Sequence, residues 1–147
     1  MKNFICYIFI IASIVVITFI FLRFHRESKA ASSFLGTYGW EVSGQPTESE
    51  DVTIPDEFDD VYISYNRLQK DAGLDLTPYR GRKGTRYTFS VTNYPDENVS
   101  DVRANVIVIS GVPVAGDIST VAFDGFMHSL SAKTADCISP AYEACTP

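Results

Sequence analysis

A run of nineteen residues without a charge, a proline or a glycine lies near the N-terminus and limits what the chain can fold into. It spans Phe4–Leu22, FICYIFIIASIVVITFIFL. At the rise of an α-helix this run measures about 28 Å, close to the roughly 30 Å hydrocarbon core of a bilayer. We therefore predict a single transmembrane helix here, and this helix is the expected contact with the membrane.

A cleaved signal peptide is the alternative interpretation of this segment. Signal peptides have an apolar region of roughly 7–15 residues, which ends at a cleavage site of small residues. The run here is longer, and charged residues that include Arg23 and Arg26 separate it from Ala30 and Ala31. These differences favour an uncleaved anchor, with residues 1–29 forming the anchor and its basic collar.

The flanking charges and the short N-terminal tail favour opposite orientations in the membrane. Lys2 precedes the apolar run, whereas Arg23, Arg26 and Lys29 follow it, so the positive-inside rule places the rest of the chain in the cytoplasm. A single anchor with a minimal N-terminal tail, by contrast, most simply exports the domain that follows it.

Two cysteines near the C-terminus decide our expectation about the compartment. Cys137 and Cys145 bound the segment CISPAYEAC and can close a nine-residue loop. A disulfide is typical of small exported domains, although spacing alone does not establish pairing, and two free thiols are the alternative. We expect a single-pass protein of the cell membrane with an extracytoplasmic domain and a disulfide between these cysteines.

The charge of the chain beyond the anchor excludes one class of partner. Eight basic and seventeen acidic residues follow Lys29, which gives this part a formal charge of −9. Proteins that bind nucleic acid need a basic footprint for the phosphates. We therefore expect no nucleic-acid partner.

One amphipathic helix is predicted over Asp56–Ala72. Its apolar residues recur with the helical period and form one stripe. Asp56 is the expected N-cap and Gly73 the expected C-cap, since these residue types favour those positions. The stripe consists of Phe58, Val61, Tyr62, Tyr65, Leu68 and Ala72.

The strands are expected mainly in the second half of the chain. The apolar run Ala104–Ile109, the turn Ser110–Gly111 and the apolar residues from Val112 to Ile118 predict a β-hairpin. The segment Arg86–Tyr94 alternates between polar and apolar residues, which is typical of a half-buried strand. Two shorter strands are predicted at Trp40–Val42 and Val52–Ile54, with a loop over Ser43–Asp51 and a short helical turn at Thr77–Pro78.

These elements predict an α+β fold over residues 30–131, followed by a C-terminal tail over residues 132–147. The long amphipathic helix packs on a small antiparallel sheet, and the transmembrane helix precedes both. We expect the aromatic residues of the helix stripe and of Arg86–Tyr94 to form the contact layer between helix and sheet.

Asp117, Asp124 and His128 are the candidate residues for chemistry. Two carboxylates and an imidazole can bind a divalent metal ion or transfer protons. Their spacing matches no known motif, and both aspartates stand beside glycines as turn residues do. The sequence therefore assigns no catalytic, metal or cofactor site, and no cofactor is expected.

Several segments together resemble one bacterial family. The segments are FLGTYGWEV (Phe34–Val42), VTIPDEFDDVYISYNRLQKDAGLDLTPYRG (Val52–Gly81), RYTFSVTNYP (Arg86–Pro95) and GDISTVAFDGFMH (Gly116–His128). In this order they are similar to the family called domain of unknown function 4830. The resemblance implies a short, N-terminally anchored protein of a low-GC Gram-positive bacterium, and it brings no catalytic residue or activity.

The expected function is that of a membrane-tethered, non-enzymatic binding or protein-interaction module outside the cytoplasm. Its partner would be a protein or a small molecule of unknown identity. A small hydrolase or metal-dependent enzyme that uses Asp117, Asp124 and His128 is the alternative. A third possibility is a regulatory partner of another membrane protein that faces the cytoplasm.

Overall fold

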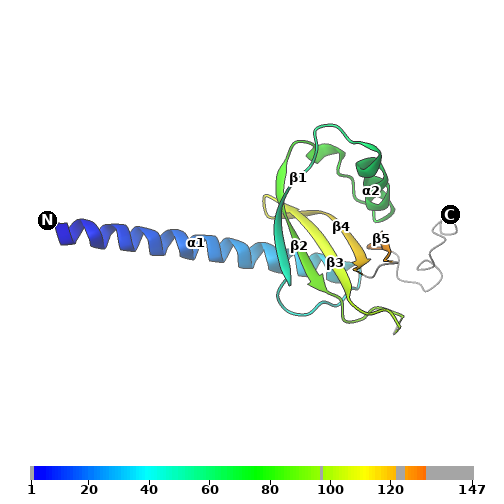
Figure 1. Cartoon of the computed structure of the whole chain (residues 1–147), viewed down its shortest axis with the longest axis horizontal. Coiled ribbons are helices and arrows are strands. Elements are labelled where there is room, and N and C mark those ends of the chain that lie inside the picture. Colours follow the sequence, from blue (N-terminus) through cyan, green and yellow to red (C-terminus); the bar gives the residue numbers. More distant parts are fainter. Residues whose placement is uncertain (1, 97, 122–124, 132–147) are drawn as a thin grey trace.

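A computed structural model describes residues 2–96, 98–121 and 125–131 of the chain. Helix α1 extends as a long rod from one side of a small domain, which contains the remaining elements (Figure 1). In chain order the elements are α1 (Lys2–Thr37), β1 (Glu48–Thr53), α2 (Asp60–Asp71), the 3₁₀ helix η1 (Thr77–Tyr79), β2 (Lys83–Ser90), β3 (Val102–Ile109), β4 (Val112–Thr120) and β5 (Met127–Ser129).

The five strands form one antiparallel sheet in the order β1-β2-β3-β4-β5. The predicted α+β class is therefore confirmed, and so is the hairpin, which β3 and β4 form. Its turn has positive φ angles at both Ser110 (53°) and Gly111 (81°). Two such residues make a type I′ turn, whose twist matches that of the flanking strands.

A β-bulge interrupts the pairing of β3 with β4. Ile109 pairs with Val112 beside the turn, but beyond the bulge Ile107 pairs with Ala115. An extra residue on one strand moves its following side chains to the opposite face of the sheet. Because of this shift, Asp117 lies opposite Asn105.

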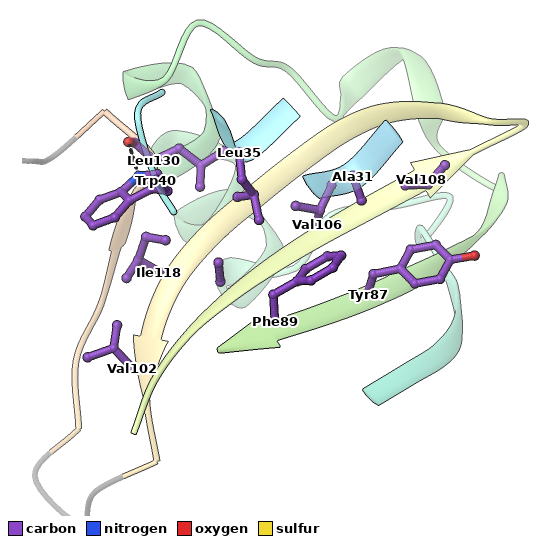
Figure 2. Packing of buried hydrophobic residues seen from close by; sticks show 11 residues of the cluster. Ala31, Leu35, Trp40, Tyr87, Phe89, Val102, Val106, Val108, Ile118 and Leu130 are labelled. Atoms are coloured by element: carbon purple, nitrogen blue, oxygen red, sulfur yellow. Dashed lines mark hydrogen bonds between the residues drawn. The ribbon is translucent and has the colours of Figure 1, made fainter. Parts of the chain in front are cut away.

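The C-terminal turns of α1 cover one face of the sheet. Ala31 and Leu35 are fully buried there with Tyr87 and Phe89 of β2 (Figure 2). The predicted contact layer is wrong for the aromatic residues of β2, because they pack in the cluster of α1 rather than with α2. The segment after the apolar run is thus a direct continuation of α1 and an integral part of the core.

The other end of α1 is apolar and unburied. This N-terminal helix is long and apolar enough to cross a membrane, by length and composition, and its most apolar window has no buried residue. A signal sequence has the same properties.

Contacts between α1 and the sheet begin close to the end of the apolar run. The buried carboxylate of Glu27 accepts hydrogen bonds from Arg23 Nε (3.0 Å) and from the Tyr87 hydroxyl (3.1 Å). The ring of Phe24 lies 5.6 Å from that of Tyr87. Burial, reinforced by Glu27, raises the pKa of Tyr87 to about 12, so its hydroxyl remains a donor. These contacts fix the direction in which α1 leaves the domain.

Helix α2 lies against the opposite face of the sheet. Phe58, Tyr62 and Tyr65 are partly buried against Ile107 and other apolar residues of that face. Their predicted packing on the sheet is confirmed. Because helices cover both faces, β3 is buried along most of its length, which explains its nearly continuous apolar sequence.

The predicted start of α2 was too early. The helix begins at Asp60, and Asp59 rather than Asp56 caps it, since its carboxylate accepts a hydrogen bond from the backbone N–H of Tyr62 (2.8 Å). Val61 belongs to the predicted stripe but is 73% exposed.

Strand β1 begins at Glu48, inside the segment predicted to be a loop. Its acidic residues pair across the sheet, Glu48 with Arg103 (3.3 Å) and Glu50 with Arg86 (2.6 Å). Such cross-strand ion pairs support an edge strand that has no apolar alternation. In the other short strand predicted, at Trp40–Val42, only Val42 forms a bridge.

Candidate functional site

A groove opens between α2 and the face of the sheet that α1 leaves free. Its volume is about 790 Å³. Tyr62 and Leu68 of α2 form one wall, and Ile107 of β3 and Met127 of β5 contribute apolar surface from the sheet. Binding sites for small molecules are typically mostly apolar clefts of about 300–1,000 Å³ with a few polar groups, and this groove has that character.

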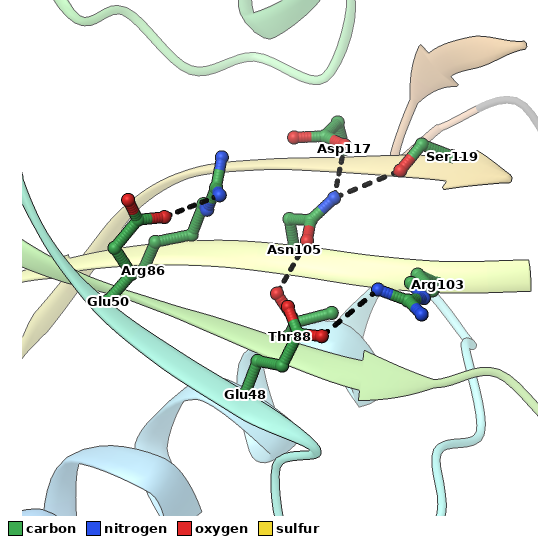
Figure 3. Close-up of polar contacts among 8 residues, drawn as sticks. All are labelled: Glu48, Glu50, Arg86, Thr88, Arg103, Asn105, Asp117 and Ser119. Atoms are coloured by element: carbon green, nitrogen blue, oxygen red, sulfur yellow. Dashed lines mark hydrogen bonds and ion pairs between the residues drawn. The ribbon is translucent and has the colours of Figure 1, made fainter. Parts of the chain in front are cut away.

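The floor of the groove is a network of hydrogen bonds centred on Asp117 and Asn105 (Figure 3). Oδ1 of Asp117 accepts from the Tyr65 hydroxyl (2.9 Å), and its Oδ2 accepts from Asn105 Nδ2 (2.8 Å). Asn105 Nδ2 also donates to Ser119 Oγ (3.0 Å), and Asn105 Oδ1 accepts from Thr88 Oγ1 (2.8 Å). Residues from α2, β2, β3 and β4 thus hold one another in place.

Burial raises the pKa values of both acidic groups in this network. It raises the pKa of Asp117, and the hydrogen bonds from Asn105 and Tyr65 oppose this rise because they stabilise the carboxylate. The pKa of Tyr65 is raised well above its ordinary value by burial and by the neighbouring Asp117. The tyrosine therefore keeps its proton and donates it in a hydrogen bond to the carboxyl group. Such a floor is rigid, and its polar atoms are largely satisfied within the protein.

Arg86 brings a positive charge to the groove. One of its terminal nitrogens forms an ion pair with Glu50 of the edge strand β1 (2.6 Å), and the Arg86 side chain is 45% exposed. A guanidinium has five N–H donors, so the pair with Glu50 leaves donors for another acceptor. The groove therefore combines apolar walls with one cationic donor.

The sheet separates two of the residues that the sequence analysis proposed for chemistry. Asp117 lies in the groove, whereas His128 pairs with Ile118 and lies on the α1 side of the sheet. Residue Asp124, like Cys137 and Cys145, lies outside the described residues. Within the described part of the chain, no group of three or more His, Cys, Asp or Glu side chains could hold a metal ion.

The surroundings of His128 are aromatic. Its ring lies 5.3 Å from Phe126 and 6.0 Å from both Trp40 and Tyr94. Its Nδ1 is 2.9 Å from the carbonyl oxygen of Ser129. Burial lowers the pKa of His128, and the hydrogen bond to the carbonyl opposes this only in part. The imidazole is therefore a buried part of this aromatic cluster, and burial favours its neutral form.

Sequence reasoning missed Tyr65, Asn105 and Arg86 as members of one site. Tyr65 was assigned to the core from its helical period, and the period gives no information about a polar partner of its hydroxyl.

The buried residues of α2 are two amides, Asn66 and Gln69, which the sequence analysis did not expect. Gln69 Oε1 accepts from the backbone N–H of Gly116 (2.8 Å), and Asn66 Oδ1 accepts from that of Leu76 (2.8 Å). Their amides complete backbone hydrogen bonds, which a hydrophobicity pattern does not reveal.

Comparison with known proteins places the chain in a family without giving it an activity. No curated protein and no solved structure matches it. One family profile matches residues 34–118, a span that runs from the last turns of α1 through α2 to Asp117 and so includes most of the groove. The resemblance noted from the sequence is confirmed by this match, and the chain belongs to the family described as domain of unknown function DUF4830.

Proposed function

We propose that this protein is a single-pass, membrane-tethered binding module of a bacterial cell, with no catalytic activity and with its domain outside the cytoplasm. In this proposal the apolar half of α1 is the anchor, and the groove between α2 and the sheet is the binding site. The groove carries the proposal because it combines a suitable volume, apolar walls and a rigid polar floor.

The lining of the groove defines the ligand by its chemistry. Tyr62, Leu68 and Ile107 offer apolar contact to a flat or branched apolar body. Arg86 offers N–H donors to a carboxylate or carbonyl oxygen at one end of that body. A small molecule of this type fits, and so does an apolar side chain of a protein partner beside its backbone carbonyl. Because the Asp117 network is held together internally, the floor need not rearrange when such a ligand binds.

Two substitutions on α2 test the groove. Ser64 lines the groove, so Ser64→Trp fills it without removing a core contact. Ile63→Trp is the matched control, since Ile63 is exposed on the same helix but does not line the groove. The probe is a panel of aromatic carboxylates and amides, and binding to the full chain in lipid nanodiscs is followed by saturation-transfer NMR. We expect members of the panel to bind the wild type and the control but not Ser64→Trp. If the wild type binds none of them, or if Ser64→Trp binds equally well, the groove is not the site.

Alkaline carbonate extraction of membranes tests the tether separately. An integral protein stays in the membrane pellet, and an intact mass then distinguishes an anchor from a cleaved signal peptide. Release into the supernatant, or loss of the N-terminal residues, would refute the tether while leaving the binding groove in place.

A further inference from the structure

A second recess lies where α1 leaves the domain, beside the turn of the β3–β4 hairpin. Its volume is about 500 Å³. Phe19, Leu22 and Arg26 line it from α1, and Ser110 and Gly111 line it from the turn. The tip of the hairpin is therefore level with the last residues of the apolar run, so the domain sits directly on the membrane surface if that run is the anchor.

The recess is basic. Arg23 and Arg26 both line it, and so does Glu27, whose two carboxylate oxygens are engaged by Arg23 and the Tyr87 hydroxyl. Arg26 forms no ion pair with any residue that the structure describes. Lys83 is the first residue of β2 and lies at the same end of the sheet. Thr85 pairs with Val108 of β3, so the two residues before Thr85 lie near the turn of the β3–β4 hairpin. An anion in the recess would meet at least one uncommitted guanidinium.

The apolar and basic parts of the recess are ordered by depth. Phe19 and Leu22 are exposed by 69% and 60% and end the apolar run. Arg23 follows Phe19 by about 6 Å along the helix axis at the usual rise. In a bilayer, acyl chains would lie beside Phe19 and Leu22, and the phosphate layer would lie at the level of the arginines. Arginine is well suited to phosphate, because its planar guanidinium donates two parallel hydrogen bonds.

We propose that this recess binds the headgroup phosphate of an anionic phospholipid and so holds the domain in a fixed position on the membrane. The proposal rests on the proposed membrane tether. It assigns Arg26 as the main phosphate ligand, Arg23 as the second cation, and the Ser110–Gly111 turn as the opposite wall. The lipid need not compete for the groove beside α2, since that groove lies on the other face of the sheet.

Native mass spectrometry of the full chain released from nanodiscs tests the lipid site. Nanodiscs of phosphatidylglycerol and phosphatidylcholine in equal amounts serve as the source of lipid, and the ratio of the two retained lipids is measured. We expect the wild type to retain phosphatidylglycerol preferentially. Arg26→Gln should reduce this preference about fivefold, because it removes the guanidinium that donates to the phosphate; fivefold corresponds to about 1 kcal/mol. Lys29→Gln removes a charge from the same helix outside the recess, and it should leave the preference unchanged.

A second pair of variants tests the opposite wall of the recess. Ser110 has a positive φ of 53°, which Asn and Asp tolerate better than most residues. Ser110→Asp adds a negative charge and should reduce the preference, whereas Ser110→Asn adds similar volume and should retain it. Equal losses in Ser110→Asp and Ser110→Asn would mean that the turn acts by shape alone, and they would overturn a phosphate site at this wall.

Three other results would overturn the proposal. An equal loss in Arg26→Gln and Lys29→Gln would show general attraction by the basic collar rather than a site. Displacement of the lipid by millimolar inorganic phosphate would show a site for small free anions. Absence of any lipid preference in a protein that carbonate does not extract would refute the lipid site alone, whereas extraction by carbonate would refute the tether as well.

Discussion

Leu35→Ala tests whether α1 is part of the folded domain or only a rod that carries it. Leu35 has no exposed surface and packs on the sheet in the cluster that contains Phe89 and Trp40. Leucine-to-alanine substitutions in cores cost about 2–5 kcal/mol, with the larger values where the surroundings cannot collapse into the cavity. Paired strands below the side chain and a helix above it resist such collapse. We therefore expect a loss of about 3 kcal/mol in the free energy of unfolding.

Leu22→Ala is the matched control, because it makes the same chemical change on the same helix. Leu22 is 60% exposed, so its substitution should change the free energy of unfolding of the domain by less than about 0.5 kcal/mol. The assay is urea unfolding of the full chain in detergent micelles. Trp40 is the single tryptophan and is buried beside the site of the change, so its fluorescence reports on unfolding directly.

A loss below about 1 kcal/mol for Leu35→Ala, or equal losses in the two variants, would refute this reasoning, since surface substitutions typically stay within that range. Such a result would mean that the last turns of α1 detach readily and that the sheet is stable without them. The fixed direction of α1, and the position of the hairpin turn beside Leu22, would then no longer follow from the fold.

Three more predictions concern the core. Phe58→Ala should cost about 2 kcal/mol in urea unfolding, below the value for a fully buried ring, because Phe58 is only partly buried under Arg80. Gly116→Ala should cost about 1–3 kcal/mol in the same assay, since its Cβ would lie 2.8 Å from a methyl carbon of Leu130 and 2.9 Å from a backbone oxygen, whereas Gly36→Ala meets nothing and should be neutral or stabilising. His128 has a lowered pKa in the fold, so its contribution to stability is present above pH 6.5 and decreases as the pH falls below that value. Melting temperatures at pH 7.5 and pH 5 should therefore differ more for the wild type than for His128→Phe.

The β-bulge shows where prediction of the site from the sequence ends. A two-residue turn at Ser110–Gly111 pairs Ile109 with Val112, and the same register continued without interruption would pair Ala104 with Asp117. That pairing would place Asp117 on the face that α1 covers. The bulge shifts the register by one residue, and Asp117 lies opposite Asn105 on the groove face instead. Pro113 lies beside the bulge, and a proline inside a sheet is typical of one. It does not show which residue is extra or how far the register shifts, so the hairpin was predictable but the network on the groove floor was not.

Helix α1 shows a second limit of sequence reasoning. Composition identified Phe4–Leu22 as apolar, the helical period identified Phe58, Tyr62 and Tyr65 as a packing surface, and the structure agrees with both. The sequence gave no sign that the residues after the apolar run would form the second helical layer on the sheet. Ala31 and Leu35 stand in a segment rich in Ser and Ala, yet both are fully buried in the same cluster as Phe89. One helix is thus both the apolar rod and a core element. The prediction placed the aromatic residues of β2 against α2 because it allowed only one helix on the sheet.

The C-terminal cysteines provide a test of the compartment that is independent of the fold. If the domain is exported, Cys137 and Cys145 should form a disulfide, since the segment between them contains Pro140 and can turn back. Closing a nine-residue loop restricts the unfolded chain by about 2.5 kcal/mol in the loop-entropy treatment. The loop is local to the terminus, so reduction should barely change the melting temperature of the domain. Intact cells that produce the Cys6→Ala variant are treated with a membrane-impermeant maleimide, with and without prior reduction. Labelling only after reduction is the expected result. Labelling that requires lysis would place the domain in the cytoplasm, as the basic residues after the apolar run favour, and labelling without reduction would show an exported domain with free thiols.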